Sequence, residues 1–465
     1  MNEKKRLIKN TGIIAVGNIS TKLVSFFLLP LYTNILSTAE YGTVDYIISI
    51  ATFCVPFISL LMDESMFRFL IDCETKKEKE KIITNSLCII LLGGSLFSIV
   101  SIPILSIVRY QYTIYFVVYI LSVVLSTMIS ALLRGIGRTD QYAIYNFLIT
   151  TIQIILNVVF LAVLYLGVIG MLLAAIVSQI VVSIIYIIKF KMWRYIVKRY
   201  ISLDVVKDML IYSVPLIPNK LSWSIINLSD RIIIMNFLGS SFSGLYAIAY
   251  KFPNLMDTVY GFFYQSWKES SARVVGNDSK DDFYNFIYDN LKRFMYSIVL
   301  GMIAFMPVVF KILINPSYSY AINYVPILLL ATYFANISGF YGGIFTAYKD
   351  TKIMGTTTIA AAIINLVVNI LLIYKIGLYA AAFSTLISNL VVYIYRKIKV
   401  EKYVILKEYI TDRIISWIVT IVILICFYLN ENILIVLACI ISMVYAIIHN
   451  RFVFNVFFRK LVPKK

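Results

Sequence analysis

The chain has 465 residues, of which 60% are hydrophobic and 14% charged, and its 42 Lys and Arg against 24 Asp and Glu give a formal net charge of +18. Soluble domains carry roughly 25% charged and about 45–50% apolar residues, so these few charges could not keep so much apolar surface in water. The composition excludes a soluble enzyme, a nucleic-acid-binding protein and a disordered protein. It predicts an all-α polytopic membrane protein.

Apolar segments long enough to cross a bilayer recur along the whole chain. A helix rises about 1.5 Å per residue, so roughly 20 apolar residues span a hydrocarbon core of about 30 Å. The first apolar stretch is too long for a cleaved signal peptide and is expected to remain as a membrane helix. The segments predict about fourteen transmembrane helices, near residues 11–36, 43–67, 83–108, 112–133, 142–166, 168–188, 209–237, 243–267, 291–314, 323–347, 353–374, 377–395, 412–429 and 432–450.

Positive charge is distributed unevenly between the connecting loops. If Met1 lies in the cytoplasm, the inner segments carry 35 Lys and Arg, whereas the outer side holds only Arg109, Lys311 and Lys375. This positive-inside pattern predicts a multi-pass membrane protein with both termini in the cytoplasm. The predicted outer loops are too short to hold a catalytic site, which argues against an enzyme.

The residues that cofactor and metal chemistry requires do not cluster in the sequence. The five Cys form no C-x-x-C pair, no G-x-x-x-x-G-K-[ST] loop for nucleotide binding is present, and the single His449 has no catalytic partner near it in sequence. We therefore predict no cofactor, no metal site and no catalytic residue.

Matches between the two halves indicate an internal duplication. At an offset of 202 residues, Ser20, Asn34, Leu36 and Gly42 match Ser222, Asn236, Leu238 and Gly244. At 212, Thr139 and Asn157 match Thr351 and Asn369, and at 210 the matches are Gly167, Ser178, Val181, Val182 and Ile184 with Gly377, Ser388, Val391, Val392 and Ile394. The predicted division is two parallel six-helix bundles, 1–200 and 201–400, followed by two C-terminal helices and a basic tail in 401–465. Two such bundles form a cleft that can open to either side, the geometry of alternating access.

Four cations fall inside predicted spans: Lys22 and Lys220 near the midplane, Arg231 nearer the outer side, and Lys251 in the outer half of its helix. Each would cost roughly 2.5–3.5 kcal/mol if it faced lipid, so each must face a wet cavity or a partner. We consider all four candidate substrate-binding residues, with structural pairing between helices as the alternative.

Acidic residues lie in the same spans. Asp63, Asp230 and Asp257 are candidate ion-coupling residues, because a desolvated carboxylate near a cation can exchange protons or sodium ions. Glu64 and Arg68 have the i, i+4 spacing of a structural salt bridge. Asp230 and Arg231 are adjacent, so their side chains point about 100° apart and a mutual pair is not expected.

Aromatic residues allow two interpretations. Those near span ends are interpreted as interfacial anchors: Tyr41, Tyr46, Tyr110, Tyr112, Trp193 and Trp267. Four tyrosines in the span 243–267 could instead stack on sugar rings, although core packing is the simpler interpretation: Tyr246, Tyr250, Tyr260 and Tyr264.

The run from Asn10 to Asp45, with N-T-G-I-I-A-V-G-N-I-S-T-K and then L-P-L-Y-T-N-I-L-S-T-A-E-Y-G-T-V-D, resembles the opening of Wzx-type polysaccharide-biosynthesis flippases. These belong to the multidrug, oligosaccharidyl-lipid and polysaccharide exporter superfamily. The resemblance continues in G-R-T-D-Q-Y at Gly137 to Tyr142, in Trp267 at the end of the eighth span, and in the plan of six, six and two helices.

The resemblance implies a flippase that moves a polyprenyl-diphosphate-linked oligosaccharide across the plasma membrane, for assembly of O-antigen, capsule or exopolysaccharide. It implies a cationic cavity, onto which Lys22, Lys220, Arg231 and Lys251 map, and partners that include membrane lipids, a polysaccharide polymerase and a chain-length regulator, but no nucleic acid. The alternative is a cation-coupled multidrug and toxin extrusion exporter of the same superfamily. Four basic residues in the spans argue against a cationic drug, and a peptidoglycan-precursor flippase is a further alternative.

Overall fold

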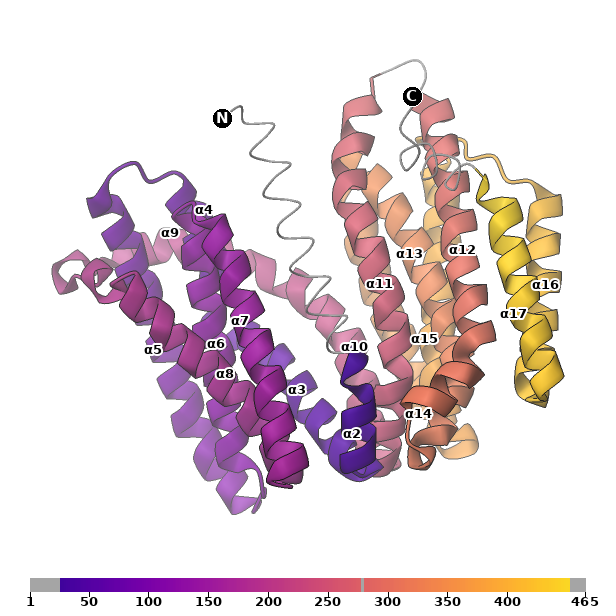
Figure 1. Ribbon diagram of the computed structural model, residues 1–465. Helices are drawn as coiled ribbons and strands as arrows, with labels where there is room; N and C mark the ends of the chain where they lie inside the picture. Colours follow the sequence, from indigo (N-terminus) through magenta and orange to yellow (C-terminus); the bar gives the residue numbers. More distant parts are fainter. Residues whose placement is uncertain (1–25, 277–279, 452–465) are drawn as a thin grey trace, which may run out of the picture. The chain divides into compact units, whose positions relative to one another are not determined.

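The computed structural model describes residues 26–276 and 280–451, and every regular element in these residues is a helix (Figure 1). Ten of these helices are long and apolar enough to cross a membrane. Each predicted span from the second to the fourteenth coincides with one helix or with consecutive helical segments, whereas most of the first span lies outside the described residues. The prediction of an all-α polytopic membrane protein is confirmed.

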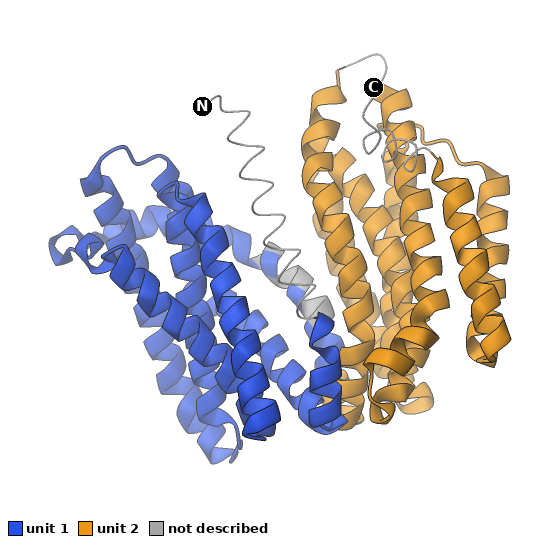
Figure 2. Cartoon of the chain, in the orientation of Figure 1, with its two compact units in different colours: residues 1–231 blue, residues 232–465 orange. Residues whose placement is uncertain are grey.

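The chain divides into two compact units, residues 1–231 and 232–465 (Figure 2). The helices of unit 1 are α2 (Leu29–Ile35), α3 (Thr38–Ser59), α4 (Met62–Ile71), α5 (Lys76–Ile107), α6 (Thr113–Gly135), α7 (Thr139–Asn157) with a π-helical extension (Val158–Val163), α8 (Gly167–Lys189) and α9 (Leu203–Ser213). Two short 3-10 turns, Met192–Tyr195 and Lys198–Tyr200, precede α9, and a third, Val214–Leu216, joins it to α10 (Ile217–Phe237), which contains the division between the units.

Unit 2 contains α11 (Ser240–Val274), α12 (Lys280–Leu313), a 3-10 segment (Pro316–Tyr324), α13 (Val325–Ala347), α14 (Lys352–Ile376), α15 (Tyr379–Val400), α16 (Ile410–Leu429) and α17 (Asn432–His449). The last two helices pack against each other and against α12 (Figure 1). The finer division at residues 200 and 400, with 401–465 as a separate segment, stays a prediction.

Helix bounds in the two units repeat at the offsets that the sequence matches predict. α3 begins at Thr38 and α11 at Ser240, 202 residues later, and α13 begins and ends 212 residues after α6. Gly167 and Gly377, which match at 210, both have a positive φ, of 54° and 57°. Such a backbone favours glycine because a Cβ atom would be strained there. The recurrence of helix bounds, and of a positive φ at matching glycines, supports a duplication.

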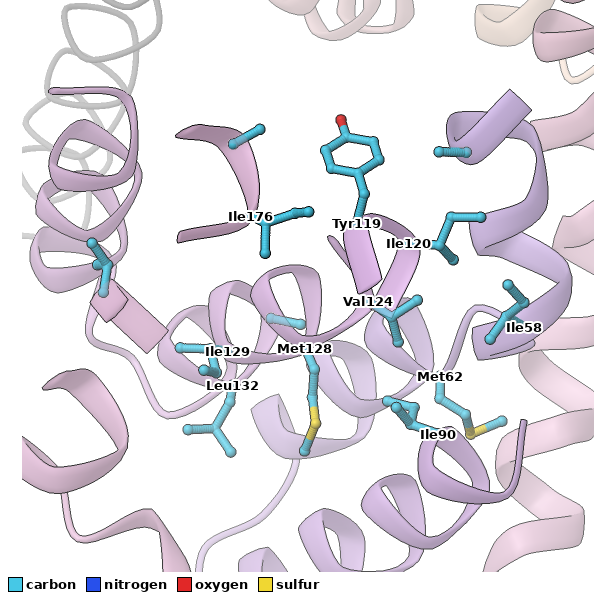
Figure 3. Packing of buried hydrophobic residues seen from close by; sticks show 14 of the residues in the cluster. Ile58, Met62, Ile90, Tyr119, Ile120, Val124, Met128, Ile129, Leu132 and Ile176 are labelled. Atoms are coloured by element: carbon cyan, nitrogen blue, oxygen red, sulfur yellow. The ribbon is translucent and has the colours of Figure 1, made fainter. Parts of the chain in front are cut away.

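The core of unit 1 is a cluster of buried apolar side chains from α3 to α9. Figure 3 shows Ile58, Met62 and Ile90, from α3, α4 and α5, gathered beside Val124 of α6. Ile58 and Met62 flank the point where α3 ends and α4 begins, so the core packs on both sides of this break. Because lipid tails are as apolar as these side chains, close van der Waals packing, and not removal from water, holds the broken helix in place.

Candidate functional site

The second predicted span is two helices rather than one. α3 ends at Ser59 and α4 begins at Met62, and between them Leu60 and Leu61 both adopt left-handed backbone, with φ of 49° and 52°. This conformation costs roughly 1–2 kcal/mol for each residue that carries a Cβ. Pro56, one turn before the end of α3, lacks the N–H that would continue the hydrogen-bond ladder. Broken helices of this kind expose backbone dipoles and often mark binding sites in transporters.

A polar cavity of about 250 Å³ lies next to the break, and we call it the unit 1 polar cavity. It is lined by one turn of α4, by the second half of α6 and by the start of α7: Asp63, Glu64, Phe67, Ser126, Thr127, Ser130, Ala131, Arg134, Tyr142 and Asn146. Both acids lie in the first turn of α4, where the positive end of the helix dipole stabilises negative charge. The break therefore places two carboxylates at the wall of a membrane cavity.

Arg134 is the cation of this cavity. Its guanidinium carbon lies 4.1 Å from the ring centroid of Phe67 and 5.5 Å from that of Tyr142, so two aromatic faces hold it. No carboxylate oxygen in the described residues lies within 4.0 Å of its nitrogens. The planar guanidinium can donate two parallel hydrogen bonds to a phosphate or a carboxylate. Arg134 is one of the 35 cations that the positive-inside pattern assigns to the inner segments, and the apolar run that precedes it in α6 is the sequence signal for its place in the cavity.

Lys220 is exposed in α10, and its charge acts on the Asp63 carboxylate. The cavity is thus lined by two acids, Asp63 and Glu64, and one cation, Arg134, while Lys220 acts on Asp63 from outside the lining. Such an arrangement can bind an anion through its cations while a carboxylate takes up a proton or a sodium ion.

Arg231 has a partner that the sequence pattern did not indicate. Its Nε donates a hydrogen bond of 2.7 Å to Oδ2 of Asp45, and the two side chains are only 10% and 18% exposed. This pair joins α10 to α3 across 186 positions of sequence, and Asp45 offsets the charge of Arg231. The geometry favours the structural alternative for Arg231 over substrate binding.

The other candidates are placed as follows. Lys22 lies outside the described residues. Lys251 is half-buried and Asp257 exposed, both in α11, and Asp230 is 2% exposed in α10. The structure thus brings Asp63 and Lys220 into one electrostatic neighbourhood, and the roles of all seven candidate residues stay predictions.

The expected salt bridge between Glu64 and Arg68 is wrong. Arg68 pairs instead with Asp72, at 2.5 Å between Nη1 and Oδ2. Because the helix restarts at Met62, Glu64 falls in the first turn of α4 beside the cavity, while Arg68 and Asp72 continue along its exposed end.

Two of the expected interfacial anchors are core residues. Tyr41 and Trp267 are each 2% exposed, and Trp267 stacks on Phe340 with ring centroids 4.3 Å apart and donates its Nε1–H to the Phe340 carbonyl oxygen. Trp193 is half exposed, as an anchor requires. In α11, Tyr246 and Tyr260 are buried, which confirms core packing for these two tyrosines.

Arg396, another of the cations that the positive-inside pattern assigns to the inner segments, is buried. It is 3% exposed in α15 and donates to Oγ1 of Thr357 in α14, at 2.8 Å from Nη2, and to the Ser338 carbonyl oxygen in α13, at 3.3 Å from Nη1. Its guanidinium therefore ties three helices of unit 2 together, with no carboxylate within 4.0 Å in the residues that the structure covers. The four-residue spacing of Ser388, Val392, Arg396 and Val400, all buried, was the available signal.

Comparison with known proteins identifies the family. The family model described as "Polysaccharide biosynthesis protein" matches residues 7–267, more than half of the chain. No curated protein matches the sequence.

Solved structures share the fold at low identity. The lipid II flippase MurJ, in an inward closed conformation, has a TM-score of 0.67 and 16% identity over 96% of this chain and 99% of that one. A multidrug resistance MATE family transporter of the MOP superfamily, in an inward-facing conformation, has a TM-score of 0.63 and 16% identity over 84% and 98%. A MOP superfamily transporter from Pyrococcus furiosus, described as having a binding pocket of reverse polarity, has a TM-score of 0.57 and 16% identity over 86% and 96%.

Proposed function

Because this chain belongs to the polysaccharide biosynthesis protein family and has the fold of MOP superfamily transporters, we propose that it is a flippase for a polyprenyl-diphosphate-linked oligosaccharide. It acts by alternating access in the bacterial plasma membrane, and its product is used to assemble O-antigen, capsule or exopolysaccharide. Both termini lie in the cytoplasm, and a polysaccharide polymerase and a chain-length regulator act with it.

Arg134 is the observation that carries the substrate assignment. A guanidinium within a membrane cavity, held by two aromatic rings and with N–H groups available, matches the planar, bidentate recognition of a diphosphate oxygen pair. The hydroxyl and amide groups that line the same cavity, including Ser130 and Asn146, suit the polar groups of a sugar. If an apolar drug bound here, these polar groups would lose their hydrogen-bond partners, which would cost about 1–3 kcal/mol of binding free energy for each group.

Lys22, Lys220 and Lys251 add positive charge for the diphosphate or for acidic sugars. Asp63, with Glu64 beside it, is the site of coupling to protons or sodium ions, because substrate binding at Arg134 changes the charge that the carboxylate experiences. Asp230 and Asp257 are further candidates for this coupling. Arg231 acts mainly through its pair with Asp45.

The two carboxylates of the cavity are the one observation that favours the alternative, a cation-coupled multidrug and toxin extrusion exporter. An organic cation would bind Asp63 and Glu64 and would be repelled by Arg134. The two functions therefore predict opposite effects when the charge at position 134 is removed.

The test is depletion of the protein in its host, followed by mass analysis of polyprenyl-diphosphate-linked glycans and complementation with variants. We expect depletion to accumulate a complete lipid-linked repeat and to abolish surface polysaccharide. Arg134→Gln should fail to restore the polysaccharide. Arg138→Gln, which removes an exposed cation four residues away, should restore it.

Three results would contradict the proposal. Unchanged lipid-linked glycans together with new sensitivity to cationic drugs would assign the exporter function. Accumulation of a peptidoglycan precursor would assign a different lipid-linked substrate. Full complementation by Arg134→Gln would show that the unit 1 polar cavity does not bind the diphosphate through Arg134.

A further inference from the structure

A second charged cavity, of about 80 Å³, lies within unit 2. It forms where α12, α13 and α15 meet the first turns of α16 and the last turn of α17, and we call it the unit 2 cationic cavity. Its charged lining comes from α12 (Lys292, Arg293), from the start of α16 (Asp412, Arg413) and from Glu408, just before α16. This site is separate from the unit 1 polar cavity and has no role in the function proposed above.

The carboxylates of this cavity already have partners within the protein. Glu408 accepts hydrogen bonds from Lys397 Nζ at 2.6 Å and from the Tyr288 hydroxyl at 2.7 Å. Asp412 accepts one from Nη2 of Arg293 at 2.7 Å. Four cations, counting Lys397, thus surround two acids, and both acids are satisfied by internal donors.

The cations, in contrast, retain unused donors. Nε of Arg293 is buried and has no hydrogen-bond partner in the described residues. Lys292 is 21% exposed, and its ammonium lies 3.7 Å from Asp289, too far for a good hydrogen bond. Arg413 is 53% exposed and lies 3.5 Å from Glu408. A buried N–H without an acceptor is unfavourable, so an external acceptor that reaches Nε of Arg293 would be bound favourably.

We propose that the unit 2 cationic cavity binds the phosphate of an anionic phospholipid, whose acyl chains lie along α16. The chemistry of the cavity, an excess of N–H donors and positive charge, suits a phosphate. The position suits a lipid headgroup, because the cavity lies at one end of the α16 and α17 pair and Trp417, at its wall, is 45% exposed. The outer face of α16 is apolar at helical spacing, with Ile414, Ile418, Ile421 and Ile425 all about half exposed.

The predicted orientation identifies the leaflet. The start of α16 lies within the basic segment 396–413, which the positive-inside pattern assigns to the cytoplasm, so the lipid comes from the inner leaflet. Anionic phospholipid bound here would join α12 to the two C-terminal helices and stabilise their packing.

The test uses the full chain, purified in detergent and titrated with phosphatidylglycerol or with phosphatidylcholine of the same acyl chains. Native mass spectrometry measures bound lipid and thermal unfolding measures stabilisation. We expect a clear preference for phosphatidylglycerol. The double variant Lys292→Gln/Arg413→Gln should weaken its binding roughly tenfold, as expected for the loss of charge-assisted contacts. Glu408 keeps Lys397 and Tyr288 in this variant, so the fold should persist.

The matched control is Lys399→Gln/Lys402→Gln, which removes two exposed charges at the same end of unit 2 outside the cavity. It should retain the preference. Equal binding of the two lipids, or equal losses in the two double variants, would overturn the site. If inorganic phosphate or pyrophosphate stabilised the wild type to the same extent as phosphatidylglycerol, the ligand would be a free anion. That result would contradict the assignment of the site to a phospholipid. If the cavity variant unfolds, Lys292→Arg, which keeps the charge, must retain the preference.

Discussion

Nε of Arg231 lies 2.7 Å from Oδ2 of Asp45, and this ion pair joins α10 to α3. Removing one partner would leave the other charge largely buried, which costs about 3 kcal/mol or more. We expect Asp45→Asn and Arg231→Gln each to lower the thermal stability of the purified protein, and the double variant to recover much of the loss. Losses that simply add in the double variant would show that the pair contributes no coupling energy.

The two rings around Arg134 predict a graded loss of transport. Arg134→Lys keeps the charge but loses the planar fork, so we expect flipping to fall roughly tenfold or more. Phe67→Leu removes one cation–π face, worth about 0.5–1 kcal/mol or more when desolvated, and should reduce flipping several-fold. The measurement is surface polysaccharide per unit of protein in complemented cells. If Arg134→Lys equals the wild type, charge alone suffices.

Gly93 allows α5 to approach the end of α3. A Cβ atom at this position would overlap the carbonyl oxygen of Ile58, whereas at Gly94 it would only touch the flexible side chain of Leu121, at 3.1 Å. Gly93→Ala should therefore destabilise unit 1 by about 1–3 kcal/mol, as overpacking does, while Gly94→Ala should have a smaller effect. Thermal unfolding of the two variants side by side measures the difference. Equal stability of the two variants would mean that the backbone of α3 can move away from the added Cβ atom without loss of stability.

At position 396, we expect only a residue that donates hydrogen bonds to the same oxygens to maintain the stability of the protein. Arg396→Met leaves Oγ1 of Thr357 and the carbonyl oxygen of Ser338 without this donor in a buried position, and we expect a loss of about 2–4 kcal/mol in stability. Arg396→Lys should recover only part of the lost stability, because an ammonium can donate to fewer of these oxygens than a guanidinium can. Lys399→Met, in the same helix but exposed, is the control. An Arg396→Met protein as stable as the control would show that the hydrogen bonds contribute nothing net.

Glu408 predicts a pH dependence of stability. Burial raises the pKa of its carboxyl, but hydrogen bonds from Lys397 and Tyr288, with the charges of Lys397 and Lys292, outweigh burial and lower the pKa. A carboxyl with a lowered pKa stabilises the folded state above its unfolded pKa, and this contribution is lost as the pH falls through the folded value. The melting temperature of Glu408→Gln should therefore lie below the wild type at pH 7, and the gap should narrow in acid.

Glu401→Gln, an exposed carboxyl close by in sequence, is the control for this pH effect and should change little at either pH. A constant gap between Glu408→Gln and the wild type from pH 7 to pH 4 would show that the charge of Glu408 does not contribute.

Sequence alone determined the fold class and the approximate positions of most helices, and it indicated a duplication. These features depend on local or periodic properties: the length of an apolar run, and residues that recur at a constant offset. The membrane helices can be predicted from sequence because a helix that crosses a bilayer needs about 20 consecutive apolar residues. The quoted motifs also identified the family correctly.

Only the tertiary structure decided which charges meet. Asp45 and Arg231 are 186 positions apart, and Arg68 could have paired with Glu64 as well as with Asp72 by spacing alone. The break at Leu60 and Leu61 persists in a poor local conformation because the surrounding core holds it, and it turns Glu64 toward the cavity. Arg134 and Arg396 each follow an apolar run, so the sequence pattern placed them in loops. In the structure, neighbouring helices pack around both side chains. Contacts between distant helices set these environments, and no local pattern encodes them.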